Sequence, residues 1–266
     1  MIAIVIIGLS RSSSKLVDTH IRRAQTEAFL DAGINRLIVG LLDSRSHWKI
    51  DGIPREFVFS GQKLQLTAWY ERGKYDLNYA TESSLMALFK AAGASESDAS
   101  TSARAITELR ASGGQTAKLF HSVTEVRSIP KISSNLYCQV APSLTVYSQQ
   151  TEPDNRVASG LVLSVLANIG SDRRTDFSNV LPENSAISGL EEGGQAVTLR
   201  AELTSESHIR KGLTSSAKEI VIRFTGNVRQ PVWQLAVRDG LDEIECRQHL
   251  KLANYQEAKR SFSQKK

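Results

Sequence analysis

The stretch Glu56–Tyr70, EFVFSGQKLQLTAWY, predicts the β-rich part of the fold. Apolar and polar residues alternate on both sides of Gly61-Gln62, which predicts a two-residue loop with glycine in the first central position, as in a type II′ turn. The resulting register places two phenylalanines opposite two leucines on one buried face: Phe59 with Leu64, and Phe57 with Leu66. The stretch is therefore predicted to be a β-hairpin.

Upstream of this hairpin, two short apolar runs, Met1–Leu9 and Leu37–Leu42, are typical of buried strands. Residues 17–32 between them have apolar side chains at helical spacing, and Gly33 stands where a glycine often ends a helix. The spaced residues are Val17, Ile21, Ala24 and Ala28. A membrane helix needs roughly 20 apolar residues, so Met1–Leu9 predicts no membrane span, and no membrane partner is expected.

Downstream, residues 82–92 and 98–112 are predicted to be helices, the second beginning at a capping box formed by Ser95 and Asp98. They form either a small helical insertion at about residues 80–115 or two core helices of the same domain. The remaining expected elements are short strands within Leu136–Tyr147, a helix or buried strand over 155–169, a strand over Ala196–Leu203, a hairpin of Lys218–Phe224 with Val232–Val237 around Gly226-Asn227, and a helix over Leu241–Lys259.

Both halves of the chain thus repeat a rhythm of strands, one helix and a hairpin. This rhythm predicts an α+β fold of two ferredoxin-like (RRM-like) modules. The first would span residues 1–150 and carry the helical insertion, and the second would span 151–266. The boundary falls at the polar, proline-containing break Thr151–Arg156.

The two cysteines, Cys138 and Cys246, are far apart and form no metal-binding pattern with the five scattered histidines. We expect free thiols packed as small apolar side chains in a reducing cytoplasm. The segment between Ile6 and Lys15 partly matches a phosphate-binding loop, but Arg11 and Ser13 replace its glycines and Lys15 is one residue late. No metal and no cofactor are therefore expected.

The charge pattern favours a nucleic-acid partner. The chain has 33 Lys and Arg against 28 Asp and Glu, a net charge of +5. The surplus lies at the two ends, which indicates a local anionic partner. The candidate contacts to nucleic acid are Arg11, Lys15, Arg22, Arg23, Arg45, Arg229 and Arg238. The alternative for the residues on the first helix is a solvated face, with Arg23 paired to Glu27.

A basic protein of two ferredoxin-like modules that opens with an arginine-bearing helix resembles the CRISPR repeat-RNA processing endonucleases and the related backbone subunits of CRISPR effector complexes. The resemblance rests on the module pattern and on Arg22-Arg23. It implies a metal-independent endoribonuclease that binds a hairpin RNA and stays with other subunits in a ribonucleoprotein complex. His20 would then be the base, and Arg22, Arg23 and Arg36 would stabilise the developing phosphorane charge.

Two other classes of protein stay open. One is a structural subunit that binds nucleic acid, such as a viral or phage capsid or nucleocapsid protein, favoured by the low aromatic content, the short strands and the basic ends. The other is an enzyme acting on a small molecule through a site without a familiar motif.

Overall fold

The structure is a computed structural model that describes residues 2–112, 118–172, 194–204, 217–239 and 246, with the side chains of the first helix described from Leu16 onward. The α-helices and β-strands, in chain order, are α1 Ile2–Leu42, β1 Arg55–Phe59, β2 Gln62–Tyr70, β3 Tyr75–Asp76, α2 Glu82–Ala91, α3 Glu96–Ala111, α4 Ser134–Val140, β4 Leu144–Thr145, α5 Gly160–Asp172, β5 Ala196–Leu203, β6 Ala217–Phe224 and β7 Val232–Asp239.

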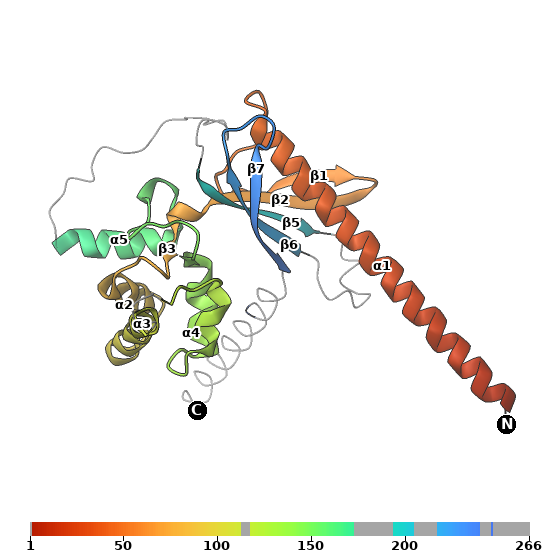
Figure 1. The fold of residues 1–266 in the computed structure, drawn as a ribbon, viewed down its shortest axis with the longest axis horizontal. Coiled ribbons are helices and arrows are strands. Elements are labelled where there is room, and N and C mark those ends of the chain that lie inside the picture. Colours follow the sequence, from red (N-terminus) through yellow and green to blue (C-terminus); the bar gives the residue numbers. More distant parts are fainter. Residues whose placement is uncertain (1, 113–117, 173–193, 205–216, 240–245, 247–266) are drawn as a thin grey trace, which may run out of the picture.

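Five antiparallel strands form one sheet in the order β1-β2-β5-β6-β7. Strand β2 pairs with β5, although the whole helical part of the chain lies between them (Figure 1). The α+β class is therefore confirmed. Two ferredoxin-like modules are not confirmed, because strands from both halves of the chain share this single sheet. The division of the chain at residue 150 stays a prediction.

The hairpin of β1 and β2 is present, with a different turn. The loop is Ser60-Gly61, and both residues have positive φ angles, 49° and 77°, as in a type I′ turn. Phe57 faces Leu64, so the predicted register is wrong by two residues. Because side chains alternate along a strand, a shift of two residues keeps every side chain on its predicted face of the sheet. Phe57, Phe59, Leu64 and Leu66 therefore lie on one face, as predicted. Phe59 is nevertheless 44% exposed, because it lies next to the turn.

The N-terminal region is one helix, α1, and not the predicted strand, helix and strand. Periodicity alone cannot separate a short apolar run in a strand from one in a buried helix. Leu37 and Leu41 are buried one helical turn apart, while Val39 between them is exposed. Gly33 is in the middle of the helix rather than at its end. A Cβ atom there would lie 2.8 Å from Leu66 Cδ2, so the glycine lets α1 approach the sheet closely.

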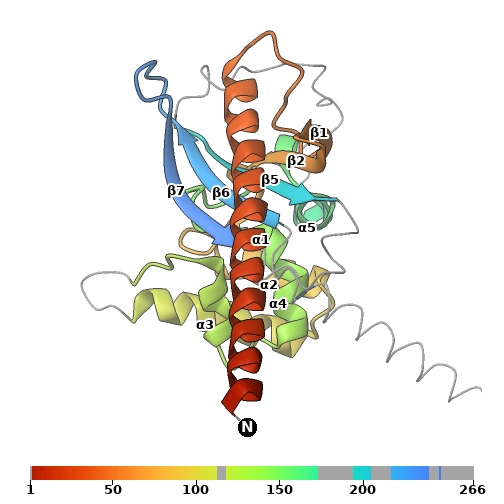
Figure 2. The same ribbon diagram turned by 90° about the vertical axis from the view of Figure 1, so that its right-hand side faces the viewer.

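The C-terminal half of α1 packs across β2, β5 and β6, and its N-terminal half projects beyond the sheet (Figures 1 and 2). The core between helix and sheet contains Leu30, Ile34 and Leu37 from α1 and Leu66 and Leu199 from the strands. On the same face, Lys218 Nζ of β6 lies 2.6 Å from Asp31 Oδ1 of α1. Lys218 Nζ also lies 3.8 Å from Glu27 Oε1, so apolar contact and the ion pairs of Lys218 hold the helix to the sheet.

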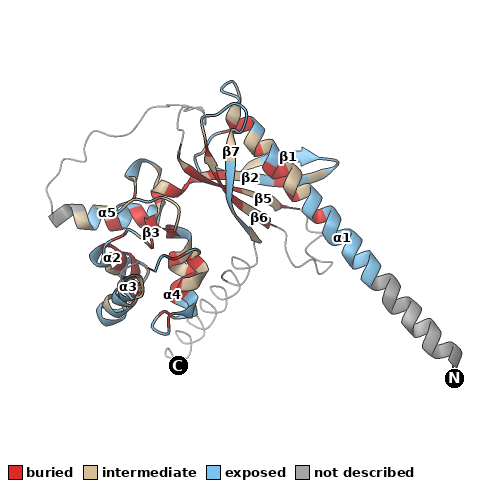
Figure 3. Cartoon of the chain, in the orientation of Figure 1, coloured by how far each residue is buried: buried red, intermediate tan, exposed pale blue. Residues whose placement is uncertain are grey.

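A second apolar core lies within the helical body, the segment from β3 to α5 (Figure 3). Helices α2 and α3 are present as predicted, and Thr81 and Ser95 cap them by accepting hydrogen bonds from the backbone amides of Ser84 and Asp98. The expectation of several short strands within Leu136–Tyr147 is wrong. This stretch contains most of α4, a 3-10 turn and the two-residue strand β4.

The last elements largely follow the sequence. Of the alternatives for residues 155–169, the helix is confirmed as α5, although Asp154 caps the short 3-10 helix before it. Strand β5 and the hairpin of β6 with β7 are confirmed, with Gly226 at a positive φ in the turn. The predicted helix over Leu241–Lys259 lies outside the described residues, apart from Cys246.

Candidate protein-interaction surface

The projecting half of α1 exposes apolar side chains. On the sheet side, the buried positions run from Thr26 through Leu30 and Ile34 to Leu41. With 3.6 residues per turn, the opposite side of the same helix carries a second apolar row. This row, called the outer stripe below, consists of Val17, Ile21, Ala24, Ala28, Ala32 and Val39.

The outer stripe is open to solvent along most of its length. Ile21 is 50% exposed and Val39 is 60% exposed. Its residues recur three and four positions apart (with one seven-residue step), which is the spacing of a helix face that packs on another helix. The alanines in its middle are small enough to allow close approach. The arrangement is therefore suited to contact with a helical protein surface.

The sequence predicts that the Val17, Ile21 and Ala24 side of the first helix faces a core and that Arg22 and Arg23 face solvent. In the structure both sides of α1 are exposed around residues 17–24, because this part of the helix extends beyond the sheet. The missed signal is the apolar spacing of three and four residues from Val17 to Ala32, which resumes at Val39 after a seven-residue step. The assignment of residues 37–42 to a strand concealed it.

The other basic residues singled out from the sequence are dispersed. Arg11 and Lys15 are in the part of α1 before Leu16, whose side chains are not described. His20 is exposed on the same helix. Arg36 Cζ lies 5.9 Å from the ring centroid of Trp48, and the exposed Arg45 pairs with Asp43.

The remaining two lie at the other end of the chain. Arg229 is exposed in the β6–β7 turn, and Arg238 on β7 lies over the ring of Tyr147. His20 and Arg23 are three residues apart on one side of α1, whereas Arg22 points to the other side, and Arg36, Arg45, Arg229 and Arg238 are elsewhere on the molecule.

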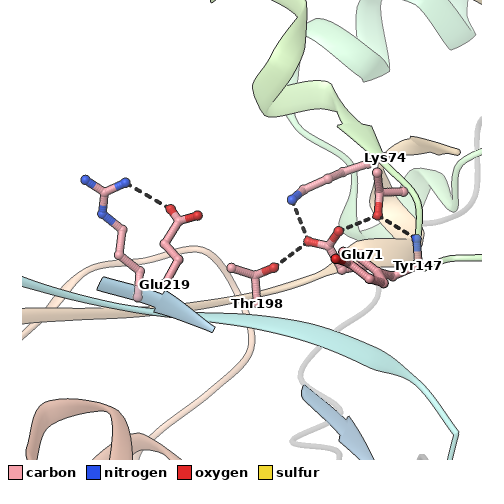
Figure 4. A network of polar contacts seen from close by, with 7 residues as sticks. Glu71, Lys74, Tyr147, Thr198 and Glu219 are labelled. Carbon is pink, nitrogen blue, oxygen red and sulfur yellow. Dashed lines mark hydrogen bonds and ion pairs between the residues drawn. The ribbon is translucent and has the colours of Figure 1, made fainter. Parts of the chain in front are cut away.

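A buried carboxylate fixes the helical body to the sheet (Figure 4). Glu71, directly after β2, is fully buried and accepts hydrogen bonds from three side chains. Lys74 Nζ is 2.5 Å from Glu71 Oε1, Thr198 Oγ1 of β5 is 2.6 Å from the same oxygen, and Thr145 of β4 donates to Oε2. The side chain of Glu71 thus links β5 of the sheet to β4 of the helical body.

Burial would raise the pKa of Glu71, but the Lys74 ammonium and the donated hydrogen bonds outweigh it and hold the pKa below its ordinary value. The carboxylate is therefore charged at neutral pH. Nearby, Arg200 bridges Glu219 and Glu202 on the same sheet face at 3.0 and 2.9 Å. These charges are paired internally, so we assign this network a structural role.

Cys138 of α4 and Cys246 form a disulfide, so the expectation of free thiols is wrong. The bond fastens the chain after β7 to the helical body. No group of three His, Cys, Asp or Glu side chains suited to a metal ion occurs in the part of the chain that is described. Among the helices that the structure describes, none combines the length and the hydropathy that a membrane crossing requires.

No protein-family model matches this chain, and no curated protein matches it. Among solved structures, a chain of the GspK-GspI-GspJ complex from the type 2 secretion system of enterotoxigenic Escherichia coli is similar. The match has a TM-score of 0.51 at 13% identity and covers 87% of this chain and 99% of the other. At this identity the likeness concerns the fold.

This likeness corrects the function expected from the sequence. The shared fold is that of a chain in a complex of secretion proteins and not that of a CRISPR RNA-processing endonuclease. The RNA-binding, endoribonuclease and nucleocapsid interpretations are therefore wrong, as is the hairpin RNA partner. The physical source of the error was an architectural pattern built on strands that the structure shows to be parts of α1.

Proposed function

We propose that this chain is a subunit of a secretion-type protein assembly and that it joins other subunits through the outer stripe of α1. The observation that carries the proposal is a 41-residue helix, half of which extends beyond the sheet with apolar residues on its surface. The likeness to a chain of a secretion-system complex supports the same conclusion.

The physical argument rests on burial of this surface. Apolar side chains such as Ile21 and Val17 gain roughly 25 cal/mol for each Å² removed from water, so a partner helix laid along the stripe stabilises the complex. The Cys138–Cys246 disulfide supports a location in an oxidising compartment, in place of the cytoplasm expected from the sequence.

The test is co-expression of the full chain with the other helix-bearing subunits of the secretion apparatus encoded in the same genome. Size-exclusion chromatography with light scattering would measure the complex. We expect Ile21→Glu to weaken association by about tenfold or more, because a carboxylate would be buried against apolar side chains. Val39→Glu, at the other end of the stripe, should act in the same direction.

Arg22→Glu is the matched control, because it introduces the same side chain one residue away, on a different side of the helix. It should associate like the unmodified chain. A complex that forms equally well with Ile21→Glu, or a chain that binds none of these subunits, would contradict the proposal.

A further inference from the structure

Two arginines lie on the sheet face away from α1. Along β6, Ile222 and Phe224 belong to the core beneath α1, so Arg223 between them points to the opposite face. Arg238 of β7 is in register with Glu219, which alternates with the core residue Ile220, and therefore points to that face as well. This face is separate from the outer stripe of α1.

Both guanidinium groups reach Tyr147, which follows β4 in the helical body. Arg223 Nη2 donates to the carbonyl oxygen of Tyr147 at 3.4 Å. Arg238 Cζ lies 5.7 Å from the centroid of the Tyr147 ring. Tyr147 therefore marks the place where the two arginines come together, at the seam between sheet and helical body.

Each arginine has a buried nitrogen with unused donor capacity. Arg223 Nε and Arg238 Nη2 are shielded from solvent, and neither has a hydrogen-bond acceptor within the described ranges. Neither arginine is in an ion pair with a described carboxylate, in contrast to Arg200 on the same face. A buried donor without an acceptor is costly, so an anion placed here would remove a penalty as well as add a charge pair.

Apolar and aromatic groups adjoin the two arginines. Trp233, in register with Arg223 across the β6–β7 pair, is 53% exposed. Tyr147 also lines a surface hollow with a volume of about 210 Å³, whose lining includes Tyr79, Leu119 and His121 as well. Tyrosine, tryptophan and arginine together are the residue types that dominate binding energy at protein interfaces.

We propose that this seam binds an acidic segment of a partner protein. A carboxylate of the segment accepts hydrogen bonds from Arg223 and Arg238, for which the planar guanidinium fork is suited. An apolar or aromatic side chain next to that carboxylate fills the hollow beside Tyr147. The exposed Trp233 next to Arg223 and the hollow lined by Tyr147 favour a peptide over a small free anion, which would leave both uncovered.

The experiment uses the full, disulfide-bonded chain and a fluorescein-labelled peptide of alternating glutamate and phenylalanine, with fluorescence anisotropy as the readout. The matched ligand replaces every glutamate by glutamine. We expect the acidic peptide to bind at least tenfold more tightly than the glutamine peptide. The Arg223→Gln/Arg238→Gln variant should lose that preference, and the single Arg238→Gln variant should lose part of it.

Three controls separate this site from other effects. Arg229→Gln removes an exposed arginine from the β6–β7 turn and should leave peptide binding unchanged. Arg223→Lys/Arg238→Lys keeps the charge and loses the fork, so it should bind more weakly than the unmodified chain. Ile21→Glu should bind the peptide normally, which distinguishes failure of this proposal from failure of the proposed function of α1.

Several results would overturn the proposal. One is no binding of the acidic peptide up to about 1 mM, the limit of weak specific affinity. Equal binding by Arg223→Gln/Arg238→Gln is a second. A third is complete displacement of the peptide by inorganic phosphate at the concentration of the peptide, or preferential binding of an oligouridylate through the same arginines. These last results would mean that the seam recognises an anion or a nucleic acid and not a protein segment.

Discussion

At the scale of single residues, close packing against α1 depends on positions where no side chain fits. Gly40 is such a position, because a Cβ atom there would lie 2.3 Å from Cδ1 of Trp48, whose indole packs on the helix. Trp48 is buried in the core between helix and sheet, so its ring cannot move aside freely.

We expect Gly40→Ala to lower the free energy of unfolding by up to about 2 kcal/mol. Overpacking costs about 1–3 kcal/mol, and the better helix propensity of alanine returns about 1 kcal/mol of it. Urea denaturation followed by tryptophan fluorescence would measure the change. Gly160→Ala is the control, since nothing lies within 4 Å of a Cβ atom there, and it should not destabilise the protein. A higher midpoint for Gly40→Ala would show that Trp48 moves aside without cost, because only the gain in helix propensity would remain.

Glu71 makes stability depend on pH in a predictable direction. Its pKa is below the ordinary value of 4.5 in the folded state, so the unfolded chain takes up a proton first as the pH falls. The stabilisation is complete above about pH 4.5 and is lost as the pH falls towards and through the lowered pKa. If the urea midpoint is measured from pH 7 to pH 3, it should therefore fall steeply once the pH is below about 4.5.

Glu71→Gln should flatten this acid slope and lower stability at pH 7 by about 3–5 kcal/mol, because it leaves the ammonium of Lys74 without its carboxylate partner. Glu96→Gln is the comparison for an exposed carboxylate. If the acid slope of Glu71→Gln equals that of the unmodified chain, another group is responsible for it.

At the scale of elements, the turn of the β1–β2 hairpin shows how local chemistry and register interact. Ser60 and Gly61 both adopt positive φ, a backbone shape for which Asn-Gly is the preferred pair. Glycine at position 61 meets this requirement, whereas serine at position 60 does so with strain.

Ser60→Asn should therefore stabilise the protein by about 0.5–1 kcal/mol, because asparagine tolerates the left-handed region better than serine. Thermal unfolding measured by circular dichroism would detect the gain. Ser60→Ala is the control and should give no gain. A loss of stability in Ser60→Asn would be inconsistent with the type I′ turn.

At the scale of the whole molecule, specific polar and covalent links join the two apolar cores. Glu71 connects β2, β4 and β5, and the Cys138–Cys246 disulfide ties the chain after β7 to α4. The disulfide closes a loop with a sequence separation of 108 residues. Closing a loop of this length restricts the unfolded chain strongly.

Cys138→Ser/Cys246→Ser should therefore be less stable by about 3–5 kcal/mol, and a reducing agent should destabilise the unmodified chain to a similar extent. Thiol titration of the unreduced, unfolded protein should detect no free thiol. The same reductant should have no effect on the double variant, which controls for other actions of the reagent. Free thiols in the untreated chain would contradict the bond.

The sequence by itself determined the elements whose signals are local. The turn glycines Gly61 and Gly226, the cap Ser95, and the alternation in β5 act over a few residues, so α2, α3, β5 and both hairpins could be predicted. The face of the first hairpin was also predictable, because an error of two residues in register does not change it.

Only the tertiary structure decided the rest. Short apolar runs such as Leu37–Leu42 fit a strand or a buried helix equally well until something packs on them. The pairing of β2 with β5 depends on residues brought together across the whole helical body. Three other features also depend on residues distant in sequence: the side of α1 that is buried, the partners of Glu71, and the convergence of Arg223 and Arg238 on Tyr147. These are contacts between residues distant in sequence, which no local pattern contains.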